Sequence, residues 1–213
     1  MKFTRIPVDT FKKMQLNAGI LLRNFDPSTG EAEEKDLIGA TTGGNNFTAT
    51  PTFSDWGEDV DNCPNNTKEL KQLDKVEAKI AGNFVTVDTG SGRDLVGAAD
   101  IDPEDPTHII PRRDLKDEDF KDLWWVGDYS DENGEKNGGY IAIHMMNTLS
   151  TGGFSIQSTK NGKGQFAFEF LAHFSIKDQD TVPYELFIKA GEAVEPVNAQ
   201  AQVSESAAET AAE

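Results

Sequence analysis

The chain has 213 residues, of which 37% are hydrophobic and 27% are charged. This length and hydrophobic content predict a single domain with a sizeable core and leave too few residues for two such domains. The formal net charge is −17, so repulsion from phosphate argues against sequence-specific binding of DNA or RNA. The longest apolar runs are far shorter than the roughly 20 residues that a membrane-spanning helix requires. We therefore expect a soluble protein that does not enter a membrane.

The ends of the chain bear on where the protein matures and where its domain stops. The single cysteine, Cys63, has no partner for an intramolecular disulfide, and the N-terminal sequence lacks the apolar stretch of a secretory signal. Both features predict maturation in a reducing cytoplasm. Residues 192–213 contain no Lys, Arg or aromatic side chain, and such a segment buries too little apolar surface to offset its ordering entropy. The packed domain is expected to end near Ala190.

In the N-terminal half, side chains alternate between apolar and polar in the way that predicts strands. The predicted strands are Met14–Phe25, Asn45–Trp56 and Leu73–Asp88. Gly82 is a candidate β-bulge within the third strand. The polar segment Asp26–Asp36 between the first two strands is predicted to be a loop.

The best helix candidate is Arg93–Ala99, with Ser91 as its cap and Gly97 limiting it to one or two turns. The run TGSGR at 89–93 lacks the lysine and the length of a phosphate-binding P-loop, so we interpret it as an ordinary turn into that helix. Residues 100–119 are dominated by Asp, Glu and Pro. This composition predicts a solvated excursion without secondary structure.

The C-terminal half is predicted to be a meander of strands. Its predicted elements are a strand at Lys121–Tyr129, a strand from Tyr140 to Met146, a hairpin over 153–176 and a last strand at Val182–Lys189. The hairpin prediction rests on Asn161-Gly162, because both residues tolerate the positive φ angles of a tight turn. It also rests on the strict alternation of Phe166, Phe168 and Phe170 with more polar residues.

Few residues converge in a pattern that supports catalysis or metal binding. The three histidines are far apart in the sequence and show no spacing typical of zinc ligands with Cys63. Acidic clusters at 55–61 and 100–105 have the oxygen density that can bind calcium, but neither matches an EF-hand loop. We interpret them as solvated acidic loops. The sequence therefore predicts no enzyme activity, no cofactor and no metal.

An aromatic run holds Trp124, Trp125 and Tyr129, which could form a stacking platform for a sugar. Neighbouring residues of a strand point to opposite faces, so at most one tryptophan serves any one surface. Core packing on one face and subunit contact on the other is the interpretation that we prefer.

Two segments, in their order around a variable acidic middle, resemble a known family. They are IPVDTFKKMQLNAGILL near the N-terminus and GDYSDENGEKNGGYIAIHMMNTLSTGGFSIQSTKNGKGQFAFEFLAHFSI in the C-terminal half. This pattern resembles the major tail tube proteins of siphophages that infect Gram-positive bacteria, and it covers most of residues 5–190. It consists of segments of similar character and contains no catalytic signature.

The resemblance implies a mainly β fold: a β-sandwich or rolled barrel of the phage tail tube type, with one short flanking α-helix, a long inter-ring loop and terminal arms. It divides the chain into an N-terminal arm (1–13), the tail tube β domain (14–190) and an Ala/Glu-rich flexible tail (191–213). The likeliest inter-ring loop falls within Asp26–Asp61. The interface candidates are Ile6, Val8 and Phe11 in the arm and Phe47, Phe53 and Trp56 near the loop.

The family's function is structural. Its subunits form stacked hexameric rings whose inner strands join into one barrel around a channel, through which genomic DNA passes during infection without sequence-specific binding. The implied partners are further copies of the chain, a tape measure protein, and the tail terminator and distal tail proteins. The implied location is the virion tail, with assembly in the host cytoplasm. Some relatives carry an additional immunoglobulin-like domain, whereas this chain has only its Ala/Glu-rich tail.

Other functions fit parts of the same pattern. A different tail component with a related fold, such as a contractile-tail tube protein or a baseplate hub subunit, shares the predicted architecture. A monomeric β-sandwich carbohydrate-binding module would use Trp124 or Trp125 as its platform, and binding would disappear on Trp→Ala. An enzyme is the last alternative, and turnover lost on changing Asp59 or Asp102 would support it.

Overall fold

The computed structural model describes residues 6–7, 10, 13–129 and 139–191. The chain forms ten strands and one α-helix within these ranges. The elements are β1 (Gln15–Leu22), β2 (Thr41–Asp55), β3 (Lys71–Phe84), α1 (Thr89–Val96), β4 (Ala99–Ile101), β5 (Ile109–Pro111), β6 (Lys121–Tyr129), β7 (Gly139–Ser150), β8 (Ser155–Gln157), β9 (Gln165–Leu171) and β10 (Tyr184–Lys189). The predicted tail over 192–213 lies outside the described residues.

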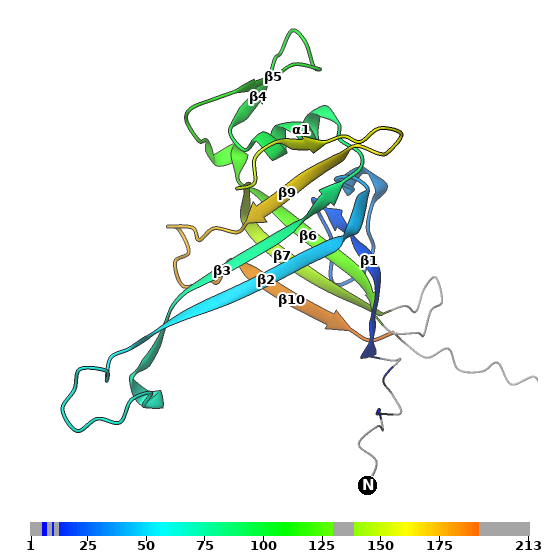
Figure 1. Ribbon diagram of the computed structural model, residues 1–213. Coiled ribbons are helices and arrows are strands. Elements are labelled where there is room, and N and C mark those ends of the chain that lie inside the picture. The colour runs from blue at the N-terminus through cyan, green and yellow to red at the C-terminus, as the bar shows by residue number, and fades with distance from the viewer. Residues whose placement is uncertain (1–5, 8–9, 11–12, 130–138, 192–213) are drawn as a thin grey trace, which may run out of the picture.

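Eight of these strands form an antiparallel sheet in the order β1-β6-β7-β9-β3-β2, with β10 added on β7 and β8 on β9. Strands β4 and β5 form a separate two-stranded sheet. Strand β7 connects the two layers, because it pairs with β6 and β10 through most of its length and with β9 only at Leu149 and Ser150. The layer of β2, β3 and β9 therefore crosses over the layer of β1, β6, β7 and β10 (Figure 1). The predicted class, a mainly β sandwich with one helix, is confirmed.

The sheet rolls toward closure without completing a barrel. Asn45 of β2 donates its side-chain amide to the carbonyl of Ala18 of β1, at 3.2 Å. Within the described residues this contact is not continued by a strand ladder between β1 and β2. Strand β2 therefore keeps an edge whose backbone groups are available for pairing with another chain. The corresponding edge of β1 is covered at its C-terminal end, where Leu22 forms a bridge with Leu37.

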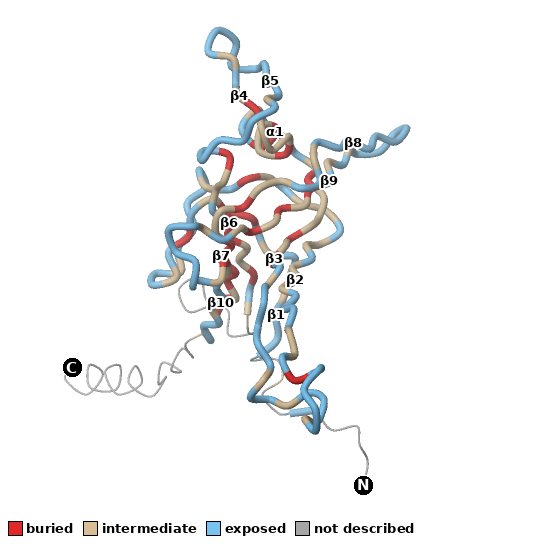
Figure 2. The backbone as a smooth tube through the Cα atoms, turned by 90° about the vertical axis from the view of Figure 1, so that its left-hand side faces the viewer, coloured by how far each residue is buried: buried red, intermediate tan, exposed pale blue. Residues whose placement is uncertain are grey.

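The core consists of two clusters, one on each face of the β6–β7 pair. Many of the buried residues gather around β6 and β7 in Figure 2. Leu21 belongs to the larger cluster and its neighbour Leu22 to the smaller one, as strand alternation requires. Phe84 is fully buried in the larger cluster, with its ring 4.4 Å from that of Phe168. Burial of a side chain of this size stabilises the fold by about 1.5–3 kcal/mol.

The predicted helix boundaries are wrong at both ends. The helix begins at Thr89 after its N-cap Asp88, and it ends at Val96 before the C-cap Gly97, so that Ala99 belongs to β4. The Asp88 carboxylate accepts a hydrogen bond from the Ser91 amide at 2.7 Å, and the Ser91 hydroxyl accepts one from the Asp88 amide at 3.0 Å. This capping box satisfies two amides that the helix leaves unpaired, so TGSGR forms the first turn of the helix.

The bulge predicted at Gly82 lies instead on the opposite strand. Thr42 pairs with Asn83 and Asn46 with Ala81, so Gly43, Gly44 and Asn45 of β2 face the single residue Gly82. Gly43 and Gly44 have φ angles of 78° and 81°, which glycine adopts without the steric cost that other residues incur. The extra residues belong to β2 for this reason.

Residues 100–119 are not the unstructured excursion that their composition predicts. Strands β4 and β5 form a short hairpin in which Asp100 pairs with Ile110 and Ile101 with Ile109. The strand predicted up to Ile176 also differs, since β9 ends at Leu171. By contrast, β6 has the predicted bounds, and the β8–β9 hairpin forms with Asn161 at a φ of 60°.

Candidate assembly surfaces

The most prominent surface feature is a long β-ribbon formed by the outer parts of β2 and β3. From Lys79 to Phe84, β3 pairs with β9 on one side and β2 on the other. From Lys71 to Ala78, its pairing within the described residues is with β2 alone. The two strands therefore leave the body of the sandwich and extend as a two-stranded arm at the lower left of Figure 1. We call residues 51–75 the ribbon, and the segment 56–70 that connects its two strands the ribbon loop.

The ribbon exposes large apolar side chains. Phe53 and Leu73 are direct cross-strand partners and are 53% and 47% exposed. Trp56 and Val60, further along, are 65% and 54% exposed. Exposed apolar residues gathered on one projection are typical of an interaction surface, whereas scattered ones are not.

The loop at the end of the ribbon is held in one conformation by its own polar groups. The two carboxylate oxygens of Asp55 accept hydrogen bonds from the amides of Gly57 and Asn66, at 3.0 and 2.9 Å. Trp56 donates its amide to the carbonyl of Leu70 and its indole N–H to the side chain of Gln72, at 3.0 and 2.9 Å. Because the loop is pre-organised, its binding to a partner costs less ordering entropy.

The predicted interface residues are only partly brought together. Phe53 and Trp56 lie on the ribbon, but Phe47 packs against the larger core cluster, with its ring 5.8 Å from that of Tyr184. Ile6 is 69% exposed. Val8 and Phe11 lie outside the described residues.

The projecting segment differs from the predicted loop Asp26–Asp61. Residues 26–38 lie against the body, where Tyr140 donates its hydroxyl to the carbonyl of Pro27 and the amide of Ile38 donates to Leu21 at 3.0 Å. The ribbon continues past Asp61 to include Leu73, which sequence reasoning assigned to a separate strand. Alternation along a strand identifies its two faces, but it does not show whether a second layer covers either one.

A second exposed surface lies along the outer edge of β10. Leu186 and Ile188 are 55% and 66% exposed, whereas Phe187 between them packs in the smaller cluster against Trp124. Strand β10 pairs with β7 on one side, and its other edge has no strand partner among the described residues. An apolar, unpaired strand edge is suited to pairing with another chain.

The adjacent tryptophans point to opposite faces, as predicted, but both are engaged within the subunit. Trp124 is 7% exposed and stacks on His144, with ring centroids 4.1 Å apart. Trp125 packs against the larger cluster and donates its indole N–H to the carbonyl of Ala18 at 3.1 Å. Both tryptophans thus contribute to packing within the subunit, and contact of the partly exposed Trp125 with another subunit stays a prediction.

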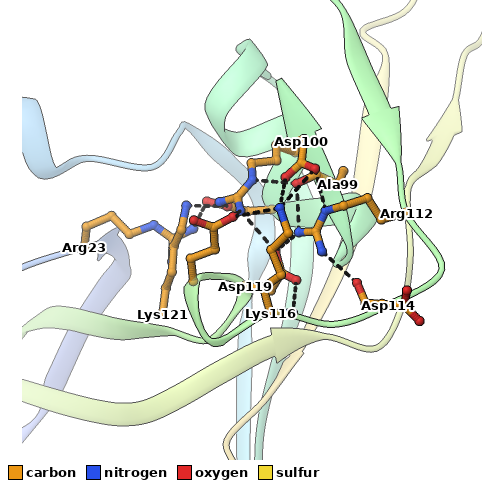
Figure 3. A network of polar contacts seen from close by, with 11 residues as sticks. Arg23, Ala99, Asp100, Arg112, Asp114, Lys116, Asp119 and Lys121 are labelled. Carbon is orange, nitrogen blue, oxygen red and sulfur yellow. Dashed lines mark hydrogen bonds and ion pairs between the residues drawn. The ribbon is translucent and has the colours of Figure 1, made fainter. Parts of the chain in front are cut away.

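Charged residues beneath the helix form a connected network (Figure 3). Asp119, whose side chain is fully buried, accepts hydrogen bonds from Arg93 at 3.0 Å and Arg112 at 2.6 Å. Asp94 of α1 pairs with Arg23 and with Lys121, the latter at 2.6 Å. The network joins α1 and the β4–β5 hairpin to the sheet, and its paired charges support a structural role.

Outside this network, His144 pairs with two carboxylates. His144 lies between Asp122 at 3.1 Å and Glu185 at 3.6 Å, and the hydrogen bond from His144 lowers the pKa of Asp122. Within the described part of the chain, no group of three or more His, Cys, Asp or Glu side chains is placed to hold a metal ion. The two acidic clusters therefore do not form carboxylate cages there.

A hollow of about 560 Å³ lies beside the β2 bulge. Small residues line most of it, including Gly43, Gly44 and Ala81. Its carboxylate, Glu169, is already paired with Thr151 at 2.9 Å and Lys79 at 3.6 Å. Its other lining residues are Gly, Ala, Asn and Phe, whose side chains supply neither a nucleophile nor a general base.

Comparison with solved structures finds distant structural likeness. No protein-family model matches the sequence, and no curated protein matches it either. A chain from a solved structure described as the virion of a native gene transfer agent particle is similar at a TM-score of 0.40 and 9% identity, covering 81% of this chain and 96% of that one. A likeness at this level assigns no function, so the proposal below rests on the chain's own surfaces.

Among the described residues, no helix is long and apolar enough to span a bilayer.

Proposed function

We propose that this protein is a non-enzymatic structural subunit of a phage-type tail tube, and that it forms stacked hexameric rings around a channel for DNA. The observation that carries the proposal is the ribbon: a pre-organised arm that leaves the body and exposes Phe53, Trp56 and Leu73. A monomeric protein gains nothing from such an arm, whereas a subunit of a stacked assembly can bury it against the next ring. The sequence resemblance to tail tube proteins supplies the ring geometry.

Lateral contacts within a ring are assigned to the open strand edges. The outer edge of β10 carries Leu186 and Ile188, and the edges of β1 and β2 meet through the single Asn45–Ala18 contact. Pairing of such edges between subunits removes unpaired backbone groups in the way that ring closure requires. Ile6, Val8 and Phe11 of the N-terminal arm are assigned to a second contact between rings.

The charge of the chain fits a channel through which DNA slides. A net charge of −17 repels phosphate, so a lumen of this character would pass DNA without holding it. The proposed partners are further copies of this chain, a tape measure protein, and tail terminator and distal tail proteins at the ends. The proposed location is the virion tail, after assembly in the host cytoplasm.

The test is assembly of the purified chain, followed by negative-stain electron microscopy and light scattering. Wild-type protein is expected to form hollow tubes or six-membered rings at high concentration. In a shortened variant, Asn-Gly replaces residues 51–76 and joins Thr50 to its cross-strand partner Glu77, since this dipeptide closes two-residue hairpins. This variant keeps Ala49 and Ala78 against the core and is expected to remain a folded, unassembled subunit.

Two results would contradict the proposal. One is wild-type protein that stays monomeric at its highest soluble concentration. The other is a shortened variant that stacks like the wild type, because the ribbon would then have no part in joining rings. Circular dichroism of the variant provides the control for folding.

A further inference from the structure

The β8–β9 hairpin is a second projection with exposed apolar residues. Every residue of β8 is exposed, and Phe154 and Ile156 are 47% and 58% exposed. Strand β8 pairs with β9 over Ser155–Gln157, and its outer edge has no strand partner in the described part of the chain. In Figures 1 and 2 this hairpin lies at the opposite end of the molecule from the ribbon.

The two projections carry opposite charge. Lys160 and Lys163 are the only charged residues between Gly152 and Glu169, and both are exposed. Neither lysine has an ion-pair partner among the described residues. The ribbon loop holds Glu58, Asp59 and Asp61, which are exposed and likewise unpaired there. In a chain of strong negative charge, a basic hairpin is therefore the natural complement of this acidic loop.

The neighbouring β4–β5 hairpin, at the same end of the molecule as β8, does not offer the same complement. Its connecting loop carries Asp102, Glu104 and Asp105, which would repel the ribbon loop. Charge complementarity thus favours the β8–β9 hairpin over the β4–β5 hairpin as the surface that receives a neighbouring ribbon.

We propose that the ribbon loop of one subunit docks on the β8–β9 hairpin of a second copy, with Phe53 and Trp56 packing near Phe154 and Ile156. In this contact Lys160 and Lys163 face the carboxylates Glu58, Asp59 and Asp61. Because the two surfaces lie at opposite ends of one subunit, the contact is heterologous and propagates from copy to copy. This inference rests on the proposed function and names the receiving surface for its ribbon.

Charge reversal tests the pairing. Lys160→Glu with Lys163→Glu is expected to raise the concentration needed for assembly by roughly tenfold or more, because like charges then face each other. Adding Glu58→Lys and Asp59→Lys to the same chain is expected to restore assembly, since every subunit then carries both reversed surfaces. The control Lys35→Glu with Lys177→Glu makes the same change in net charge at exposed positions elsewhere and is expected to assemble normally.

Cross-linking reports the contact directly. Cys63 lies in the ribbon loop, and Ser158→Cys places a second thiol on the exposed part of the β8–β9 hairpin. A short bismaleimide is expected to link the Ser158→Cys variant into a ladder of covalent oligomers. Adding Cys63→Ser should abolish the ladder. A chain with Lys177→Cys in place of Ser158→Cys should not produce one. Normal assembly of the lysine variant without a Ser158→Cys ladder would overturn the docking and leave the tail tube proposal standing. A wild-type chain that never self-associates would overturn both.

Discussion

Phe53 of β2 lies directly opposite Leu73 of β3, and both side chains remain about half exposed. Such a cross-strand apolar pair stabilises a sheet most when a second layer covers it. Here the pair lies on the part of the ribbon that extends beyond the body of the sandwich (Figure 1), where neither side chain is covered by the opposite layer. The apolar area of the pair thus contributes little to the isolated subunit, and its burial by another chain would contribute about 25 cal/mol per Å².

The first prediction concerns this pair. Phe53→Ser with Leu73→Ser is expected to change the free energy of unfolding by no more than about 0.5 kcal/mol, because surface substitutions rarely do more, and to abolish assembly measured by light scattering. The control, Ile101→Ser with Ile110→Ser, removes two exposed apolar residues from the β4–β5 hairpin. Equal loss of assembly in variant and control would show that general surface hydrophobicity, and not the ribbon, drives association.

The second prediction concerns the buried carboxylate of Asp119. Asp119→Asn removes the buried charge that Arg93 and Arg112 share and leaves them their more exposed partners Glu118 and Asp100. Removal of one partner from a buried ion pair costs about 3 kcal/mol or more. Urea denaturation measures this loss, and hydrogen exchange is expected to show faster opening of the β4–β5 hairpin. The neighbouring Glu118, with a side chain 59% exposed, provides the control, since Glu118→Gln should cost less than about 1 kcal/mol. A similar small cost for both would mean that the network does not fasten the hairpin.

The third prediction concerns the helix cap. Asp88→Ala removes the acceptor for the Ser91 amide and is expected to cost about 1 kcal/mol of stability at neutral pH. Asp88→Asn should cost much less, because asparagine also caps helices.

The same cap predicts a pH dependence. The hydrogen bond from the Ser91 amide holds the pKa of Asp88 below its ordinary value, so the ionised cap is favoured in the folded state. Its contribution is fully present above the unfolded-state pKa of about 3.9 and is lost as pH falls through the lowered folded-state value. Wild type should therefore lose stability relative to Asp88→Asn below about pH 4. Parallel stability curves for the two proteins across this range would contradict the assignment.

Sequence reasoning succeeded where the pattern is local and failed where the decisive contact is distant. The aromatic run was enough to place β6. The Asn161-Gly162 turn and the alternation of Phe166, Phe168 and Phe170 were enough to place the β8–β9 hairpin. The helix start was missed because Ser91 resembles an N-cap in isolation, and only the reciprocal bonds with Asp88 identify it as the third helical residue.

The ribbon and the charged network could not be predicted for a related reason. Leu73 alternates like a core residue, yet it is 47% exposed, because the ribbon extends beyond the body of the sandwich (Figure 1). Asp119 stands in a run of carboxylates typical of solvent-exposed loops, and its burial depends on Arg93, 26 residues earlier, and on Arg112. Partners that are far apart in the sequence cannot be identified from it, although the residue types of the ribbon and of the charged network can be read directly.

The last prediction concerns the close packing of β1 on β6. Gly19 has a φ of 70°, and a Cβ atom there would lie 2.6 Å from the ring of Trp125. Gly19→Ala therefore adds backbone strain of about 1–2 kcal/mol and displaces the Trp125 ring, whose indole N–H is hydrogen-bonded to the carbonyl of Ala18. We expect urea denaturation to show a loss of stability above about 2 kcal/mol. Gly164, where an added Cβ meets nothing within 4 Å, supplies the control, and Gly164→Ala should be neutral within about 0.5 kcal/mol. If both variants unfold at the wild-type midpoint, the contact between β1 and Trp125 does not constrain the fold. A selective loss in Gly19→Ala would show that the β1 edge is held in place by Trp125.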